Sequence, residues 1–251
     1  MMIAEASEPS RDYILLKLTS PEKLPSILPG QFVEVLVEGS PSTFLRRPFS
    51  VNFVDRERNQ LWILIRAIGD GTRQLAQRAA GETLNVMFPL GNSFTMPTSP
   101  TIKPLLVGGG VGTAPMLYLG ALLSQMSYSP TFLLGARTSD DLTQLEEFHK
   151  YGNVLITTED GSEGEQGFVT QHSALQHESF GMIYTCGPKP MMQAVARYAQ
   201  GRAIPCEVSL ENKMACGIGA CLCCVEDTKA GHKCVCTEGP VFNIEKLQWD
   251  V

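Results

Sequence analysis

Cysteines crowd towards the C-terminal end of the chain and restrict what this segment can form. Six of the eight cysteines lie between Cys216 and Cys236. Cys216, Cys221 and Cys224 follow a C-x4-C-x2-C spacing. This spacing is typical of plant-type [2Fe–2S] sites, which take one more cysteine from further along the chain. The residues leave Cys234 and Cys236 as the candidates for that fourth ligand.

A structural zinc site is the main alternative for these cysteines. Such sites usually pair two C-x2-C knuckles, whereas this segment holds one knuckle after a longer gap. Gly217 and Gly219 have no side chain, so the loop can coil tightly and direct backbone N–H groups at cluster sulfurs. The sequence therefore favours an iron–sulfur cluster, and it predicts that Cys223 is a free thiol.

Composition excludes several classes of function. With 251 residues, 43% of them hydrophobic, the chain can form two compact domains and a small third module. A formal net charge of −6 without a basic run argues against binding to nucleic acid or to an anionic membrane. The sequence shows no secretion signal and no apolar segment of about 20 residues. Because the cysteines are clustered and not spread as a disulfide framework, we expect a cytoplasmic protein.

Residues 1–98 are predicted to form an antiparallel β-barrel. Apolar, often alternating runs are separated at short intervals by Pro, Gly and Asn, which is the pattern of short strands joined by turns. Strands are expected over Tyr13–Leu18, Gly30–Val37, Pro48–Asn52, Gln60–Ala67 and Glu82–Phe88. One helix is expected over Thr72–Ala79, and the proline-rich segment Pro97–Pro100 is expected to be a linker.

Residues 99–205 alternate between strand and helix patterns, which predicts a doubly wound parallel sheet. The expected strands are Pro104–Val107, Thr131–Leu134, Val154–Thr157 and Met182–Thr185. The expected helices are Thr113–Gln125, Leu142–His149, Thr170–Ala174 and Pro188–Gln200. A last strand, Cys206–Leu210, leads into the cysteine-rich module, which we assign to residues 206–251.

A glycine-rich turn joins the first strand of the α/β domain to its first helix. From Gly110 it reads G-x-G-x-x-P and includes Gly112, Thr113 and Pro115. Tight turns need glycine in any case, but the flanking strand and helix favour a dinucleotide site, where glycine lets the backbone approach a pyrophosphate. Arg137 stands after the second strand in place of an acidic residue, so the residues leave NAD and NADP both open.

Three further groups are candidates for ligand contacts. Cys186-Gly187-Pro188 lies at a strand-to-helix corner, where ligands gather in open α/β sheets, although a lone cysteine is often only a buried apolar side chain. The barrel run Arg46–Ser50 combines guanidinium groups, a ring and a hydroxyl, which suit a phosphate-bearing planar cofactor or a solvated turn. Gly71-Thr72 could bind a second phosphate, or Thr72 could cap the barrel helix.

Taken in order, Arg-Pro-Phe-Ser, G-x-G-x-x-P and Cys-Gly-Pro resemble the ferredoxin–NADP reductase superfamily of flavoproteins over about Tyr13 to Leu210. The segment Glu211–Cys221 and the closing Gly239–Phe242 narrow this resemblance. With them, the whole chain is similar to the electron-transfer subunits of dihydroorotate dehydrogenase B. The sequence departs from the superfamily at Phe49, where tyrosine is common.

The resemblance implies a set of binding residues for each cofactor. FAD would be held by Arg47, Pro48, Phe49, Ser50, Leu64, Ile65, Arg66, Gly71 and Thr72. NAD would lie over Gly110, Gly112, Thr113 and Pro115, with Asp160, Cys186, Gly187 and Pro188 near the nicotinamide. The family's last cysteine is separated by two residues from a Gly-Pro pair, so the implied cluster ligands are Cys216, Cys221, Cys224 and Cys236.

The resemblance also implies an enzyme subunit that works with a partner. A catalytic subunit would oxidise dihydroorotate on its FMN in pyrimidine biosynthesis, and electrons would reach NAD+ through the [2Fe–2S] cluster and FAD. The family suggests a heterotetramer of two relay and two catalytic subunits. The alternatives are a reductase subunit for ferredoxin, a hydrogenase or an oxygenase and, in a different class, a zinc-stabilised nucleotide-sensing module.

Overall fold

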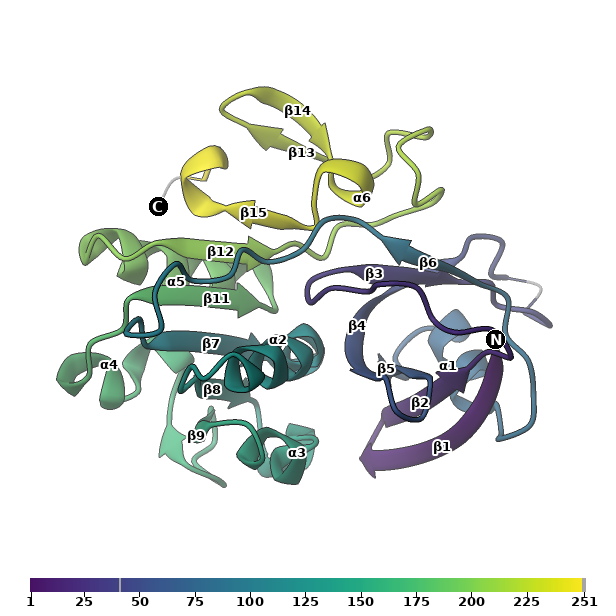
Figure 1. Ribbon diagram of the computed structural model, residues 1–251, viewed down its shortest axis with the longest axis horizontal. Helices are drawn as coiled ribbons and strands as arrows, with labels where there is room; N and C mark the ends of the chain where they lie inside the picture. Colours follow the sequence, from purple (N-terminus) through teal and green to yellow (C-terminus); the bar gives the residue numbers. More distant parts are fainter. Residues whose placement is uncertain (41, 250–251) are drawn as a thin grey trace.

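An antiparallel N-terminal sheet and a mostly parallel central sheet stand side by side, and the C-terminal cysteine-rich segment lies across one end of both (Figure 1). This is the arrangement in the computed structural model, which describes residues 1–40 and 42–249. The predicted fold class is confirmed. Among the described residues, none of the helices combines the length and the apolar character that crossing a bilayer requires.

The N-terminal sheet has the strand order β1-β2-β5-β4-β3-β6. Its strands are β1 Met2–Ser10, β2 Tyr13–Thr19, β3 Phe32–Val35, β4 Arg47–Asp55, β5 Gln60–Arg66 and β6 Val86–Leu90, with helix α1 at Asp70–Ala76. The Ile3 N–H group donates to the Glu82 carbonyl at 2.8 Å, and a bridge joins Met2 to Thr83. These contacts bring the edge strand β1 back to the residues before β6 and close the sheet into a barrel.

The central sheet has the order β10-β9-β8-β7-β11-β12-β15, and all of its neighbouring strands are parallel except β12 and β15. Its strands are β7 Pro104–Gly109, β8 Thr131–Ala136, β9 Asn153–Thr158, β10 Glu165–Gln166, β11 Met182–Cys186, β12 Cys206–Ser209 and β15 Val241–Asn243. The α-helices are α2 Ala114–Gln125, α3 Leu145–His149, α4 Ala174–His177 and α5 Lys189–Gly201. Short 3-10 turns cover Gly110–Thr113, Ser139–Asp141 and Val169–Gln171.

The barrel helix α1 begins two residues before the predicted start and ends three residues before the predicted end, and two expected helices of the central domain also differ from those found. The helix predicted over Leu142–His149 begins only at Leu145, because Gln144 adopts a left-handed backbone with φ of 56°. The helix predicted over Thr170–Ala174 is wrong: a 3-10 turn ends at Gln171, the extended residue His172 interrupts it, and α4 follows. Both departures lie in loops that face the seam between the two sheets or the ligand edge of the central sheet.

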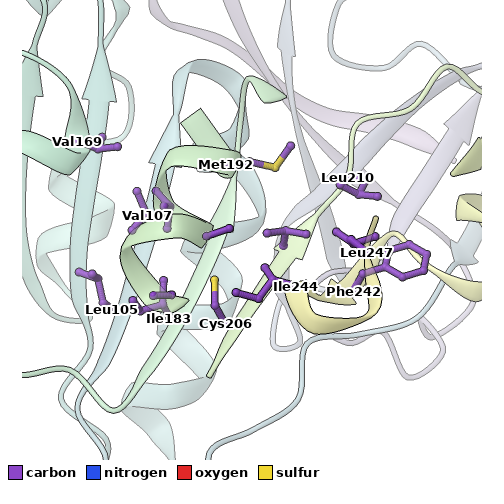
Figure 2. Packing of buried hydrophobic residues seen from close by; sticks show 14 of the residues in the cluster. Leu105, Val107, Val169, Ile183, Met192, Cys206, Leu210, Phe242, Ile244 and Leu247 are labelled. Atoms are coloured by element: carbon purple, nitrogen blue, oxygen red, sulfur yellow. The ribbon is translucent and has the colours of Figure 1, made fainter. Parts of the chain in front are cut away.

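The cysteine-rich segment shares its core with the central sheet. It contains a hairpin, β13 Val225–Thr228 and β14 Gly231–Cys234, the single turn α6 Val235–Glu238, and a 3-10 turn over Ile244–Lys246. Figure 2 shows Phe242, Ile244 and Leu247 of this segment packed in one cluster with Leu105 and Ile183 of the central strands. The segment therefore has a fixed position on the central sheet.

Side-chain hydrogen bonds hold the barrel against the central domain. Asn52 of β4 donates to the Ala114 carbonyl and to the Gln144 side chain, each at 3.1 Å. The Tyr118 hydroxyl of α2 donates to the Ile27 carbonyl at 2.9 Å. The left-handed conformation of Gln144 thus places its amide where it can meet the barrel.

Candidate functional site

A cavity of about 440 Å³ lies between the barrel and the carboxyl ends of the central strands. The barrel contributes Tyr13 and Arg66 to its wall. The central domain contributes Gly109, Gly110, Gly135–Arg137, Asp141, Thr157, Glu159, Gly167–Thr170, Pro188, Pro190, Met191 and Ala194. Ligands bind at this edge in open α/β sheets, so the cavity is the candidate nucleotide site.

The glycine turn forms the floor of this cavity. Gly110, with φ of +56°, lines the cavity. A β-carbon on Gly112 would stand 2.4 Å from the Cys186 carbonyl oxygen, so only glycine allows this close approach. Gly112 itself, Thr113 and Pro115 are buried below the turn and do not line the cavity. Of these predicted contacts, Gly110 alone faces the ligand space.

Cys186 lies beneath the cavity and not in its wall. Its side chain is fully buried, and its sulfur lies 3.7 Å from a Glu211 carboxylate oxygen. Burial, followed by the charge of Glu211, raises the pKa of the Cys186 thiol. Gly187 has φ of 150° and leads to Pro188, which does line the cavity. Of the predicted segment Cys186-Gly187-Pro188, only Pro188 therefore contacts the cavity.

Glu159 lines the cavity, whereas the predicted Asp160 does not. The Asp160 carboxylate accepts hydrogen bonds from the Ser162 hydroxyl at 2.6 Å and from its backbone N–H at 3.0 Å, and these lower the pKa of Asp160. From the residues themselves, an acidic ribose-binding residue was expected only after the second strand, where Arg137 stands, and Asp160 came from the resemblance. Glu159 follows the third strand, β9, whose carboxyl end meets the same edge of the sheet, and this was the signal that could have identified it.

Arg47 and Gly71 come together on the barrel. A β-carbon on Gly71 would stand 3.3 Å from Arg47 Nε and 3.0 Å from Thr43 Cγ2, so the absent side chain leaves a small cradle beside a guanidinium group. The Thr72 hydroxyl accepts from the N–H groups of Gly69 and Ile68, at 2.9 and 3.1 Å. Thr72 thus caps the turn, which was one of the two interpretations of this residue.

The other barrel residues divide between surface and core. Pro48, Phe49 and Ser50 are half-buried on β4. The side chains of Leu64 and Ile65 lie in the hydrophobic core, so a ligand could reach only their backbone. Arg66 lines the cavity, and its guanidinium lies 3.2 Å from a carboxylate oxygen of Asp141 in the central domain.

The cysteines of the hook Cys216–Cys236 interact in two pairs. The N–H groups of Ile218 and Cys221 and the thiol of Cys221 hydrogen-bond to the Cys216 sulfur and lower the pKa of Cys216 to about 6. In the second pair, the Cys236 N–H donates to the Cys224 sulfur at 3.4 Å. Among residues 1–40 and 42–249, no three His, Cys, Asp or Glu side chains are gathered as ligands of a single metal ion.

Cys236 is integrated in the hook more closely than Cys234. Its sulfur accepts a hydrogen bond from Gly219 N–H at 3.1 Å, and its side chain is buried. Burial and the hydrogen bond with Cys224 raise the pKa of Cys236 to about 12. The sulfur of Cys234 has no such bond to the glycine loop, and Cys223 is exposed. These contacts support Cys236 as the fourth ligand.

A buried glutamate connects the barrel to the hook. Glu34 of β3 is fully buried, and neither carboxylate oxygen has a hydrogen-bond partner among the described residues. A β-carbon on Gly217 would stand 2.9 Å from Glu34 Cγ. Burial raises the pKa of Glu34 to about 7, against the opposing charge of Arg46. Glu34 also pairs with Pro48 of the neighbouring strand β4. Glu34 therefore lies between the residues 47–50 of β4 on one side and the cysteine loop at Gly217 on the other.

Two family models match the chain. Residues 211–248 match the iron-sulfur cluster binding domain of dihydroorotate dehydrogenase B, and residues 106–197 match the oxidoreductase NAD-binding domain. The chain is 38% identical to the electron transfer subunit of dihydroorotate dehydrogenase B (NAD(+)) of Shouchella clausii, over 98% of this chain and 96% of that protein. It is 40% identical to the same subunit of Bacillus caldolyticus, over 85% and 84% of the two chains.

Solved structures share the fold. An NADH-dependent reduced ferredoxin-NADP oxidoreductase has a TM-score of 0.87 and 29% identity, over 99% of this chain and 90% of that one. The Amycolatopsis cytochrome P450 reductase GcoB has a TM-score of 0.67 and 24% identity, over 80% of this chain and 65% of that one. The second similarity concerns the fold alone.

We predict that Cys236→Ser abolishes assembly of the iron–sulfur cluster, whereas Cys234→Ser leaves it in place. A serine hydroxyl is a poor ligand for iron compared with a thiolate, and the hook hydrogen bonds converge on Cys236. Iron and acid-labile sulfide in the two purified variants measure the outcome. A normal iron content in Cys236→Ser would overturn the assignment.

We predict that Glu159→Gln lowers the preference for NADH over NADPH, expressed as the ratio of kcat/KM values, by about tenfold. The carboxylate faces the cavity, where it repels a 2′-phosphate and can accept a hydrogen bond from a ribose hydroxyl. Glu163→Gln is the control, because Glu163 is exposed nearby but does not line the cavity. An unchanged ratio in Glu159→Gln contradicts this role.

Proposed function

The chain belongs to the electron-transfer subunits of dihydroorotate dehydrogenase B (NAD+), and from this we propose that it carries FAD and a [2Fe–2S] cluster between an FMN-bearing catalytic subunit and NAD+. It is thus an NAD-dependent oxidoreductase subunit of pyrimidine biosynthesis. One observation carries the assignment of the cofactors. The barrel strand expected to hold the flavin and the cysteine loop are separated by the single residue Glu34.

The barrel residues fit a flavin dinucleotide. Arg47 Nε stands at the edge of the cradle at Gly71, and a guanidinium group is well suited to bind a phosphate. Arg47 also donates to the carbonyls of Leu45 and Arg46, which fixes its guanidinium beside the cradle. Ser50, half-buried on the same strand, supplies a hydroxyl for the cofactor, whereas the Phe49 side chain packs against the barrel core.

The hook fits a cluster of two irons. In such a cluster each iron takes two of the four protein ligands, and the hook offers the pairs Cys216 with Cys221 and Cys224 with Cys236. N–H groups of the glycine loop donate to the sulfurs of Cys216 and Cys236, at 3.5 and 3.1 Å. Such bonds stabilise thiolate sulfur that carries negative charge.

The residues around the cavity bind and orient the nicotinamide cosubstrate. When bound, FAD exchanges single electrons with a cluster and a hydride with a nicotinamide. Gly110 and Pro188 bring the two turns of the central domain to the cosubstrate, while Cys186 and Glu211 stand below them. The ion pair of Arg66 with Asp141 fixes the barrel wall of the cavity relative to the central domain.

The outer face of the hook is suited to contact with the catalytic subunit. Ile218 and Leu222 are 58% and 65% exposed, and Cys221 and Cys223 are exposed beside them. Leu222 adopts a left-handed backbone with φ of 58°, a conformation that leucine rarely takes. Exposed apolar side chains on a strained loop favour a surface that a partner covers. A heterotetramer with two copies of each subunit is part of this proposal.

The fold does not by itself separate this function from that of a ferredoxin reductase subunit, because the similar NADH-dependent oxidoreductase has the same architecture. The relatives of similar length favour the dihydroorotate system. The protein that co-purifies with the chain distinguishes the two: an FMN protein that oxidises dihydroorotate supports the proposal.

We predict that the isolated chain is brown, with FAD and [2Fe–2S] absorption, and that it oxidises NADH with artificial electron acceptors. It should not turn over dihydroorotate until the catalytic subunit is added. Visible spectra, metal analysis and both assays on the same preparation provide the test. Zinc in place of iron, or turnover of dihydroorotate by the chain alone, would refute the proposal.

We predict that the double variant Ile218→Ser, Leu222→Ser weakens binding to the catalytic subunit by at least about tenfold, because apolar anchors dominate the energy of interfaces. The iron content should stay normal, since neither side chain is a ligand. The matched control is Met126→Ser, which removes a side chain of 44% exposure at the end of α2. Equal weakening by the control, or none by the double variant, speaks against this surface.

A further inference from the structure

Tyr13 of β2 carries a hydroxyl that the fold leaves without a partner. The side chain is fully buried, and its oxygen has no hydrogen bond to any described residue. Buried polar groups are nearly always paired, because an unpaired one has lost its hydration without compensation. Two further orphan groups, Arg66 Nε and the Thr157 hydroxyl, belong to residues that line the same cavity.

The Tyr13 hydroxyl faces the glycine turn of the central domain. It lies 3.7 Å from the position that a β-carbon of Gly110 would take, and among the described residues outside 109–111 no other atom is within 4 Å of that position. A ligand atom that lies over Gly110 therefore comes beside this hydroxyl. The ring of Tyr13 is held by the Arg66 guanidinium, 5.4 Å from its centroid, and Arg66 in turn by Asp141.

The phenol can donate a hydrogen bond into this space. Burial raises the pKa of Tyr13, with a smaller opposing effect of Arg66, so that the oxygen keeps its proton at neutral pH. A suitable ligand group is a hydrogen-bond acceptor, and phosphate oxygens are strong acceptors. Glycine turns of this kind receive the pyrophosphate of a dinucleotide.

We propose that the Tyr13 hydroxyl donates a hydrogen bond to the pyrophosphate of NAD(H) as it lies over Gly110, so that the barrel supplies a binding residue for the nicotinamide cosubstrate. This inference rests on the proposed function. The cavity is assigned to NAD(H) and not to FAD because most of its lining residues belong to the central domain, which matches the NAD-binding family. The barrel contributes only Tyr13 and Arg66 to the described lining.

Tyr13→Phe tests the inference, because it removes the hydroxyl and keeps the ring. In the complex with the catalytic subunit, we expect the KM for NADH to rise about tenfold and kcat to change less than about twofold. The FAD content should stay normal. The melting temperature should stay unchanged or rise, since a buried polar group without a partner is removed.

Tyr118→Phe is the matched control. Its hydroxyl already donates to the Ile27 carbonyl at 2.9 Å and lies outside the cavity. We expect this variant to melt at a lower temperature and to keep the KM for NADH. Tyr13→Phe should raise the KM for NADH without lowering the melting temperature, whereas Tyr118→Phe should lower the melting temperature without raising the KM. This contrast distinguishes a binding role of the Tyr13 hydroxyl from a structural role.

Three results would overturn the inference: an unchanged KM in Tyr13→Phe, an equal rise of KM in both variants, or a loss of FAD in Tyr13→Phe that accounts for the change. The last result would assign the hydroxyl to the flavin. If the wild-type complex does not oxidise NADH, the proposed function itself fails, and a titration of either variant with ADP-ribose then still measures binding at the pyrophosphate.

Discussion

The antiparallel pairing of β15 with β12 fixes the position of the cysteine hook. Val208 pairs with Phe242, whose ring is buried in the core of the central domain. The Asn92 side chain adds hydrogen bonds to both the N–H and the carbonyl of Val241, at 2.9 and 2.8 Å. The cysteine-rich segment therefore takes its rigidity from the larger sheet and from the residues after the barrel. Electron transfer needs such fixed distances between cofactors.

Four of the nine described residues that carry unpaired buried polar atoms lie where ligands are expected. Tyr13, Arg66 and Thr157 surround the cavity, and Glu34 lies between the barrel and the hook. Each such group lowers the stability of the folded chain, since its hydration is lost without a compensating bond. At the cavity and beside the hook, this cost fits a trade of stability for function.

Much of the fold followed from residue patterns, and the failures have physical causes. Buried strands such as β7 and β8 are continuous apolar runs, and this pattern is sufficient to predict them from the sequence. Strand β1 was missed because Glu5 and Ser7 interrupt its apolar pattern, as the solvated side of an edge strand allows. Glu159 was missed because its role depends on which strand ends meet in space. Tyr13 could not be recognised at all, since only the packed structure shows that its hydroxyl has no partner.

The choice between Cys234 and Cys236 shows how geometry can support what spacing leaves open. Cys234 is the last residue of β14 and pairs with Val225 across the hairpin. The chain then turns into α6, and the Val235 N–H donates to the Cys224 carbonyl at 3.1 Å. This bond directs the next residue, Cys236, towards the Cys224 sulfur. A tight hairpin followed by a single helical turn thus brings Cys236 back to the glycine loop.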